Sequence, residues 1–135
     1  MKTVNYSIVA RKKPGDLEGT AKYYATAQAK GSTSLNELAE RISKSTTVTR
    51  ADCLAVLAAL EDEMGTSLQS GEIVKLGDIG TFRVSIGSTG AETVEAFNQS
   101  MIKKPKIVFR PSTKLQNLMG TLTYVRVDPR PKDEE

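Results

Sequence analysis

The sequence predicts an α+β fold, and two observations lead to that class. Residues 35–45 and 50–68 repeat apolar side chains at helical spacing, whereas residues 73–86 alternate apolar and polar side chains between glycines. A helical period followed by an alternating one is typical of helices that pack on one face of an antiparallel sheet. The chain has 135 residues, which is the size of a single domain with its own core.

The centre of this prediction is the stretch 71–82, GEIVKLGDIGTF. Gly71 stands where a helix commonly ends with a residue that tolerates positive φ. A short strand over 73–76, a turn at Gly77 and a second strand over 81–86 are expected to follow. The stretch therefore predicts a β-hairpin next to the end of a helix.

Both helices are preceded by residues that cap helix N-termini. Ser34 comes before the first helix with Glu37 at capping-box spacing, and Thr49 comes before the second with Asp52 three residues later. We expect the first helix to end near Ser45. The apolar stripe of the second helix is Leu54, Leu57, Leu60, Met64 and Leu68. The two helices and the hairpin present more apolar surface than one subunit can obviously cover.

A DNA-reading helix-turn-helix is an alternative interpretation of these two helices. The outward face of the second helix carries four acidic residues, Asp52, Glu61, Asp62 and Glu63. An acidic surface is repelled by phosphates, so we favour a structural role for the helices.

The flanking segments predict more strands and a short third helix. Residues 4–10 and 22–30 are expected to be strands joined by a basic turn, and 122–127 a last strand that pairs with 4–10. Residues 102–110 should form a strand whose Ile107 and Phe109 face the core. Ser112 is expected to cap a helix over 113–119. Three segments result, listed in order: a β extension over 1–33, a central domain over 34–120, and a strand with a tail over 121–135.

Charge is unevenly distributed, although the net charge is only +3. Residues 1–33 contain six basic and two acidic groups, residues 34–70 contain three and six, and residues 102–127 contain six basic groups without an acidic one. Such basic clusters are the electrostatic footprint of a protein that binds a polyanion. The alternative is a solvated strand whose lysines prevent edge pairing.

The residue inventory disfavours an enzyme. There is no histidine, which excludes imidazole catalysis, Ser-His triads and histidine metal ligands. The single cysteine, Cys53, is expected to be a small buried apolar residue, and it fits a reducing cytosol. We expect no catalytic site, metal or cofactor. We also expect no membrane span and no secretory signal.

Three motifs resemble the HU/IHF family of bacterial histone-like DNA-binding proteins. Residues 76–82, LGDIGTF, resemble its hairpin signature, 35–68 its helix-turn-helix dimerisation unit, and 108–115, VFRPSTKL, its closing strand and short last helix. Residues 1–33 look like the extension of the longer HU-like proteins of Bacteroidetes. The resemblance covers roughly residues 34–119.

The resemblance implies a cytoplasmic, nucleoid-associated homodimer that packages or bends double-stranded DNA without sequence preference. No small-molecule substrate is implied. Phosphate contacts are expected from six residues: Arg83, Lys103, Lys104, Lys106, Arg110 and Lys114. Such contacts position the DNA backbone and read no sequence.

In this family a β-ribbon arm lies in the minor groove and an apolar wedge opens a base step. The corresponding residues 88–101 contain no lysine, arginine or proline, but two glutamates. The arm residues of the family therefore cannot be carried over. A substitute wedge at Phe97, Met101 or Ile102 is one option, and an arm that is packed or flexible is the other. The alternative function is an HU-like structural or protein-interaction module with weak or lost DNA binding.

Overall fold

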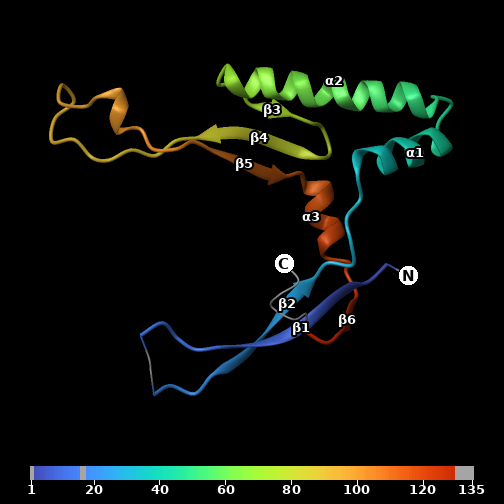
Figure 1. The fold of residues 1–135 in the computed structure, drawn as a ribbon, viewed down its shortest axis with the longest axis horizontal. Coiled ribbons are helices and arrows are strands. Elements are labelled where there is room, and N and C mark those ends of the chain that lie inside the picture. Colours follow the sequence, from blue (N-terminus) through green and yellow to red (C-terminus); the bar gives the residue numbers. More distant parts are fainter. Residues whose placement is uncertain (1, 16–17, 130–135) are drawn as a thin grey trace. The chain divides into compact units, whose positions relative to one another are not determined.

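The computed structural model describes residues 2–15 and 18–129 (Figure 1). The described residues form three α-helices, one 3-10 helix and two three-stranded sheets. They divide into two compact units, one of residues 34–118 and one that combines the described parts of 1–33 and 119–135. The mixed architecture confirms the predicted α+β class.

The predicted N-caps start both long helices of the 34–118 unit. In α1 (Leu35–Ser45), Ser34 Oγ accepts a hydrogen bond from the Glu37 backbone N–H at 3.2 Å. In α2 (Arg50–Gln69), Thr49 Oγ1 accepts from the Asp52 N–H at 3.2 Å. Each cap satisfies a backbone donor that the first turn of a helix leaves free. Gly71 follows α2 with φ 77°, in the left-handed region that favours glycine.

The sheet of this unit has the order β3-β4-β5 and is antiparallel throughout (Figure 1). Its strands are β3 (Val74–Lys75), β4 (Gly80–Ser85) and β5 (Lys106–Pro111). The β3–β4 turn is closed by hydrogen bonds from the Leu76 N–H to the Gly80 carbonyl and from the Ile79 N–H to the Leu76 carbonyl, both 2.9 Å. Leu76 belongs to this turn, so β3 ends one residue earlier than expected.

One face of this sheet is apolar and is turned toward α2. Strand register pairs Phe82 with Phe109 and Val84 with Ile107, and the two phenylalanine ring centroids are 4.7 Å apart. Ile107 lines a hollow together with residues of α2, including Leu68.

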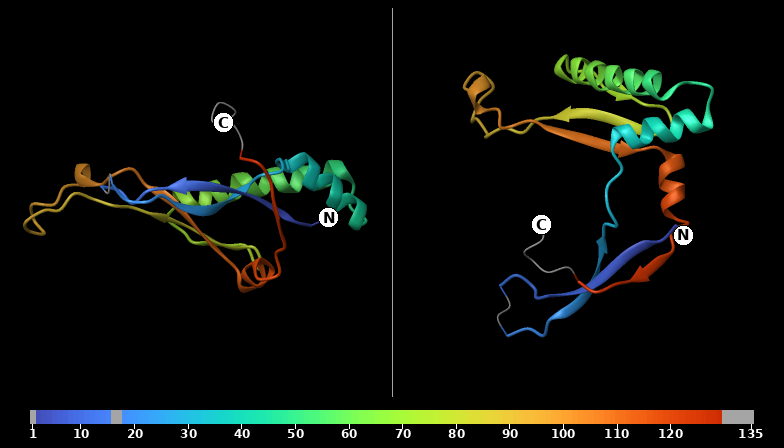
Figure 2. Two further views of the ribbon diagram at one scale, coloured as in Figure 1. Left: turned by 90° about the horizontal axis from the view of Figure 1, so that it is seen from below. Right: turned by 45° about the vertical axis from the view of Figure 1, so that its right-hand side comes forward.

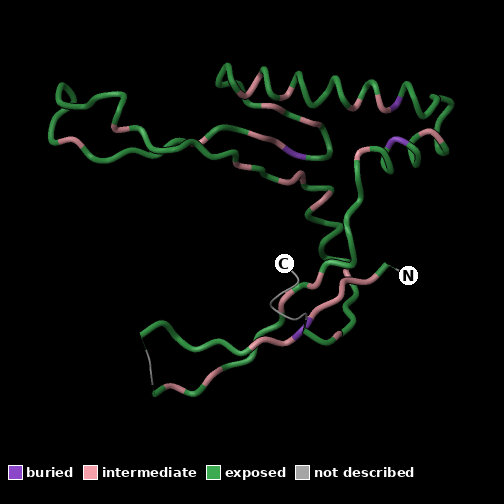
Figure 3. Tube along the Cα trace, in the orientation of Figure 1, coloured by how far each residue is buried: buried purple, intermediate pink, exposed green. Residues whose placement is uncertain are grey.

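Ile107 and Phe109 lie on the face turned toward α2, as expected, but neither is buried in the single chain. Ile107 is 65% exposed and Phe109 44% exposed. A single helix leaves part of this sheet face uncovered, and the only buried hydrophobic residues in the described chain are Ala39 and Cys53. Most of the trace is therefore exposed or half-buried (Figure 3).

The predicted β-ribbon arm is not a regular ribbon. Between β4 and β5 the chain forms a single isolated bridge, Ser88 with Ile102, and the 3-10 helix η1 (Gln99–Met101) in a loop that extends beyond the strands (Figure 2). Thr93 and Asn98 side chains accept hydrogen bonds from backbone N–H groups two or three residues later. These local bonds compete with a ladder.

The other unit is built on the sheet β2-β1-β6. The strands β1 (Val4–Arg11) and β2 (Lys22–Gln28) are antiparallel, and β6 (Tyr124–Arg126) pairs with β1 in parallel. The predicted pairing of the last strand with the first is thus confirmed.

The third helix, α3 (Thr113–Met119), begins after Ser112, whose Oγ accepts from the Leu115 N–H at 3.2 Å as expected.

Candidate nucleic-acid interface

Four basic residues share one face of the β3-β4-β5 sheet. Lys75 pairs with Thr81 and Thr81 with Arg110, while Lys106 pairs with Ser85, two residues from Arg83 on the same strand. Directly opposed residues in an antiparallel sheet point to the same face, as do residues two apart on one strand. Register therefore places four cations on this face: Lys75, Arg83, Lys106 and Arg110. We call this set the cationic face.

The cationic face lies opposite the apolar face of the same sheet. Ile107 is directed to α2. Lys106 and Arg110 lie one and three residues from it on the same strand, so alternation directs them away from that helix. All four cations are exposed. In the described chain the ion pairs are Lys44–Glu40 and Lys114–Asp78, so no carboxylate neutralises the cationic face there. The face thus offers uncompensated positive charge to solvent.

Lys103 and Lys104, predicted with this group, lie outside the strand ladder. Between Ser85 and Ser88 the outgoing chain advances three residues, while the returning chain advances four from Ile102 to Lys106. The extra residue is a bulge-like break in register. The Lys103 N–H still donates to the Gly87 carbonyl at 2.8 Å. Both lysines are exposed at the root of the loop, but strand alternation does not assign them to the cationic face.

Lys114, the last predicted contact, stands apart from the others in having a carboxylate neighbour. Its Nζ lies 3.9 Å from Asp78 Oδ2, and both side chains are largely exposed, at 69% and 80%. An exposed pair at this distance is weak and screened by salt. The adjacent Ser112 ties this helix start to the β3–β4 turn by hydrogen bonds to the carbonyls of Asp78 and Ile79.

Lys75 is the residue of the cationic face that sequence reasoning missed. It sits between Val74 and Leu76 in a short apolar run, where the polar position of an alternating strand predicts an outward side chain. That signal was available, but only pairing through Thr81 shows that Lys75 joins Arg110.

The loop 86–105 adds no positive charge before Lys103. Its two carboxylates are Glu92 and Glu95, and its apolar residues include Val94, 88% exposed, and Phe97, 41% exposed. Acidic groups repel phosphate, so this loop does not extend the cationic face.

The described residues also lack the patterns of a metal site and of a membrane-spanning helix. They contain no group of three or more His, Cys, Asp or Glu side chains arranged to hold a metal ion. Among the described helices none is both long and apolar enough to cross a bilayer.

Comparison with known proteins places the chain in a family and shows a similar solved structure. Residues 1–126 match the model of a family described as an HU domain fused to wHTH, Ig, or glycine-rich motif. The fold is similar to the crystal structure of a "putative bacterial DNA binding protein" from Bacteroides vulgatus ATCC 8482, with a TM-score of 0.66 and 11% sequence identity. The similarity covers 98% of this chain and 51% of the other, so this chain spans about half the length of that protein. No curated protein matches the chain.

Proposed function

Since the chain belongs to the family of HU domains fused to wHTH, Ig, or glycine-rich motifs, we propose that it binds double-stranded DNA without sequence preference. The observation that supports this most is the cationic face, with four exposed cations on one side of a sheet and no carboxylate partner among the described residues. The role is binding and packaging of DNA in the nucleoid, not catalysis.

The chemistry of the cationic face suits phosphates better than base edges. Arg83 and Arg110 each carry a planar guanidinium that can bind a phosphate through two hydrogen bonds. Lys75 and Lys106 add point charges on the same face. Phosphate contacts of this kind position a duplex without reading its sequence.

A mobility-shift assay tests the proposal directly. At low salt, the protein should retard two duplexes of equal length and unrelated sequence with Kd values within about threefold, because non-specific binding depends on phosphate charge. Absence of a shift for either duplex, or a strong preference for one, would contradict the proposal.

We propose that the chain acts as a homodimer, because the 34–118 unit leaves apolar side chains in solvent. Ile107 is 65% exposed on the apolar sheet face, and Val56 is 67% exposed on α2. Large apolar side chains left exposed on a sheet face and on a helix are typical of an interaction surface. A second copy of the chain, related by twofold symmetry, would cover the same patch on both subunits.

Substituting Ile107→Glu should shift the protein from dimer to monomer, with a dimerisation Kd at least about tenfold weaker, because a carboxylate would have to be buried in the interface. Light scattering over a concentration series measures this. Val94→Glu is the matched control, since Val94 is 88% exposed in the loop. Equal effects of both substitutions would remove Ile107 from the interface.

A second candidate function rests on the acidic loop. Glu92 and Glu95 stand where the family would place a DNA-binding arm, which favours a protein-interaction module with weak DNA affinity. In that case the protein would give no mobility shift at low salt but would remain dimeric.

If DNA is bound, the repulsive loop should make bending weaker than in a typical HU protein.

A further inference from the structure

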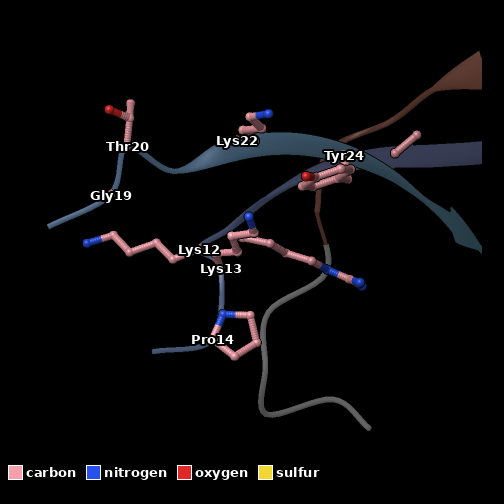
Figure 4. A pocket seen from close by; sticks show the side chains of 9 residues that line it. Lys12, Lys13, Pro14, Gly19, Thr20, Lys22 and Tyr24 are labelled. Atoms are coloured by element: carbon pink, nitrogen blue, oxygen red, sulfur yellow. The ribbon is translucent and has the colours of Figure 1, made fainter. Parts of the chain in front are cut away.

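The β1–β2 hairpin carries a second basic cluster that the cationic face does not use. A hollow of about 640 Å³ is lined by basic residues from both sides of the hairpin and by Tyr24 (Figure 4). The cations that line it are Arg11, Lys12, Lys13 and Lys22. This volume is in the usual range for a small-ligand site.

One pair of like charges faces across this hairpin. Arg11 of β1 is directly opposite Lys22 of β2, and like charges at paired positions of an antiparallel ladder are destabilising. Residues 11–24 contain four basic groups and two acidic ones, Asp16 and Glu18, of which Asp16 lies outside the described residues. No ion pair to these cations occurs in the described chain. A bound polyanion would relieve the repulsion.

Strand register separates the two neighbouring tyrosines. Tyr24 pairs with Val9, so it lies on the face that carries Arg11 and Lys22, whereas Tyr23 pairs with Ala10 and lies on the opposite face. Both rings are accessible, Tyr24 at 48% and Tyr23 at 74%. Only Tyr24 therefore combines an exposed ring with the basic hollow.

We propose that this hollow binds single-stranded nucleic acid, with phosphates on Arg11, Lys12, Lys13 and Lys22 and one base stacked on Tyr24. Basic grooves with an aromatic platform are the usual means of binding single strands. In an undistorted duplex the base faces are stacked on one another, so no face is free to stack on Tyr24. The hollow is thus assigned a ligand different from that of the cationic face.

Fluorescence anisotropy with the full chain and labelled 15-nucleotide oligo(dT) and oligo(rU) tests this. Tyr24→Ala should weaken binding about fivefold or more, because stacking on an aromatic ring contributes strongly per base. Tyr24→Phe should stay within about twofold of the parent protein, since it keeps the ring. Comparison of the two oligonucleotides shows whether DNA, RNA or both are bound.

Tyr23→Ala is the matched control and should leave oligonucleotide binding within about twofold, because its ring lies on the other face. Lys12→Ala with Lys13→Ala, outside the strands, should lower the log–log salt slope by about 1.4. This pair decides the question if Tyr24→Ala does not fold.

Duplex binding separates this proposal from the proposed function. Tyr24→Ala should keep its duplex affinity, and Arg83→Ala with Arg110→Ala should keep its oligonucleotide affinity. No binding of either oligonucleotide, equal losses for Tyr23→Ala and Tyr24→Ala, or an unchanged salt slope in the lysine variant would overturn the assignment.

Discussion

Replacing Arg83 and Arg110 together by alanine should weaken binding to duplex DNA about 30- to 100-fold at low salt. Each side chain is exposed on the cationic face without a carboxylate partner among the described residues. Two solvent-exposed contacts at a net of about 1–1.4 kcal/mol each correspond to a loss of this size for one subunit on the duplex, and the loss is larger if both subunits of a dimer contact it. Because neither side chain supports the apolar face, the fold should be retained. Anisotropy titration of a labelled duplex measures the change.

The matched control is Arg41→Ala with Arg50→Ala. These arginines are also exposed and lie on α1 and α2. Their substitution removes the same net charge. If only the total charge mattered, both double variants would lose affinity equally. We expect the control to stay within about threefold of the parent, because charges away from the contact act only through a screened field. Equal losses would contradict a localised DNA contact.

Gly80→Ala should destabilise the protein by about 3 kcal/mol or more, since it combines backbone strain with a steric clash. Gly80 has φ 147°, which side chains other than glycine rarely adopt. A Cβ at this position would lie 2.3 Å from the Arg110 carbonyl oxygen and 2.7 Å from the Phe109 ring. Urea or thermal unfolding measures the loss. The β4–β5 register that aligns the cationic face should be disturbed as well.

Gly65→Ala provides the contrast. Gly65 lies within α2, and an added Cβ would meet no atom within 4 Å. Alanine should therefore stabilise the protein by up to about 1 kcal/mol through helix propensity. A close approach of a partner subunit at Gly65 would reverse the sign. If Gly80→Ala proved as well tolerated as Gly65→Ala, the tight β4–β5 contact would be wrong.

Helix ends and the class of fold follow from interactions between near neighbours. Ser34 and Thr49 cap α1 and α2 through bonds that span three residues, and Gly71 follows the end of α2 with positive φ. Each of these features depends on side-chain or backbone chemistry within one turn, so a single sequence contains the information needed to predict it.

Composition of the cationic face depends on pairing between distant residues. Lys75 and Arg110 share a face because each is paired with Thr81. Near Lys103 the register breaks by one residue, so simple alternation would assign the residues beyond the break to the wrong face. The β4–β5 register spans the loop 86–105, so no tight turn fixes it. The predicted DNA contacts at Arg83, Lys106 and Arg110 thus share a face for a reason that the sequence pattern alone does not contain, and their role stays a prediction.

The loop 86–105 and the apolar face differ from what the sequence predicts for other reasons. Residues 86–105 lack sustained alternation, and local bonds from Thr93 and Asn98 compete with strand pairing. Ile107 has the apolar character and the strand position of a core residue, but its exposure depends on what covers the sheet. The sequence indicates an excess of apolar surface, but the apolar pattern alone does not show which strand residues stay exposed.

The salt dependence of duplex affinity tests the central claim most directly. Kd values measured for the parent protein and for the Arg83→Ala, Arg110→Ala variant over a range of NaCl concentrations should give two straight log–log lines. Loss of two phosphate contacts should reduce the slope by about 1.8 per subunit, or about 3.6 for a dimer in which both subunits contact the duplex. Two parallel lines would show that these arginines displace no counterions, and the cationic face would not be the DNA-binding surface.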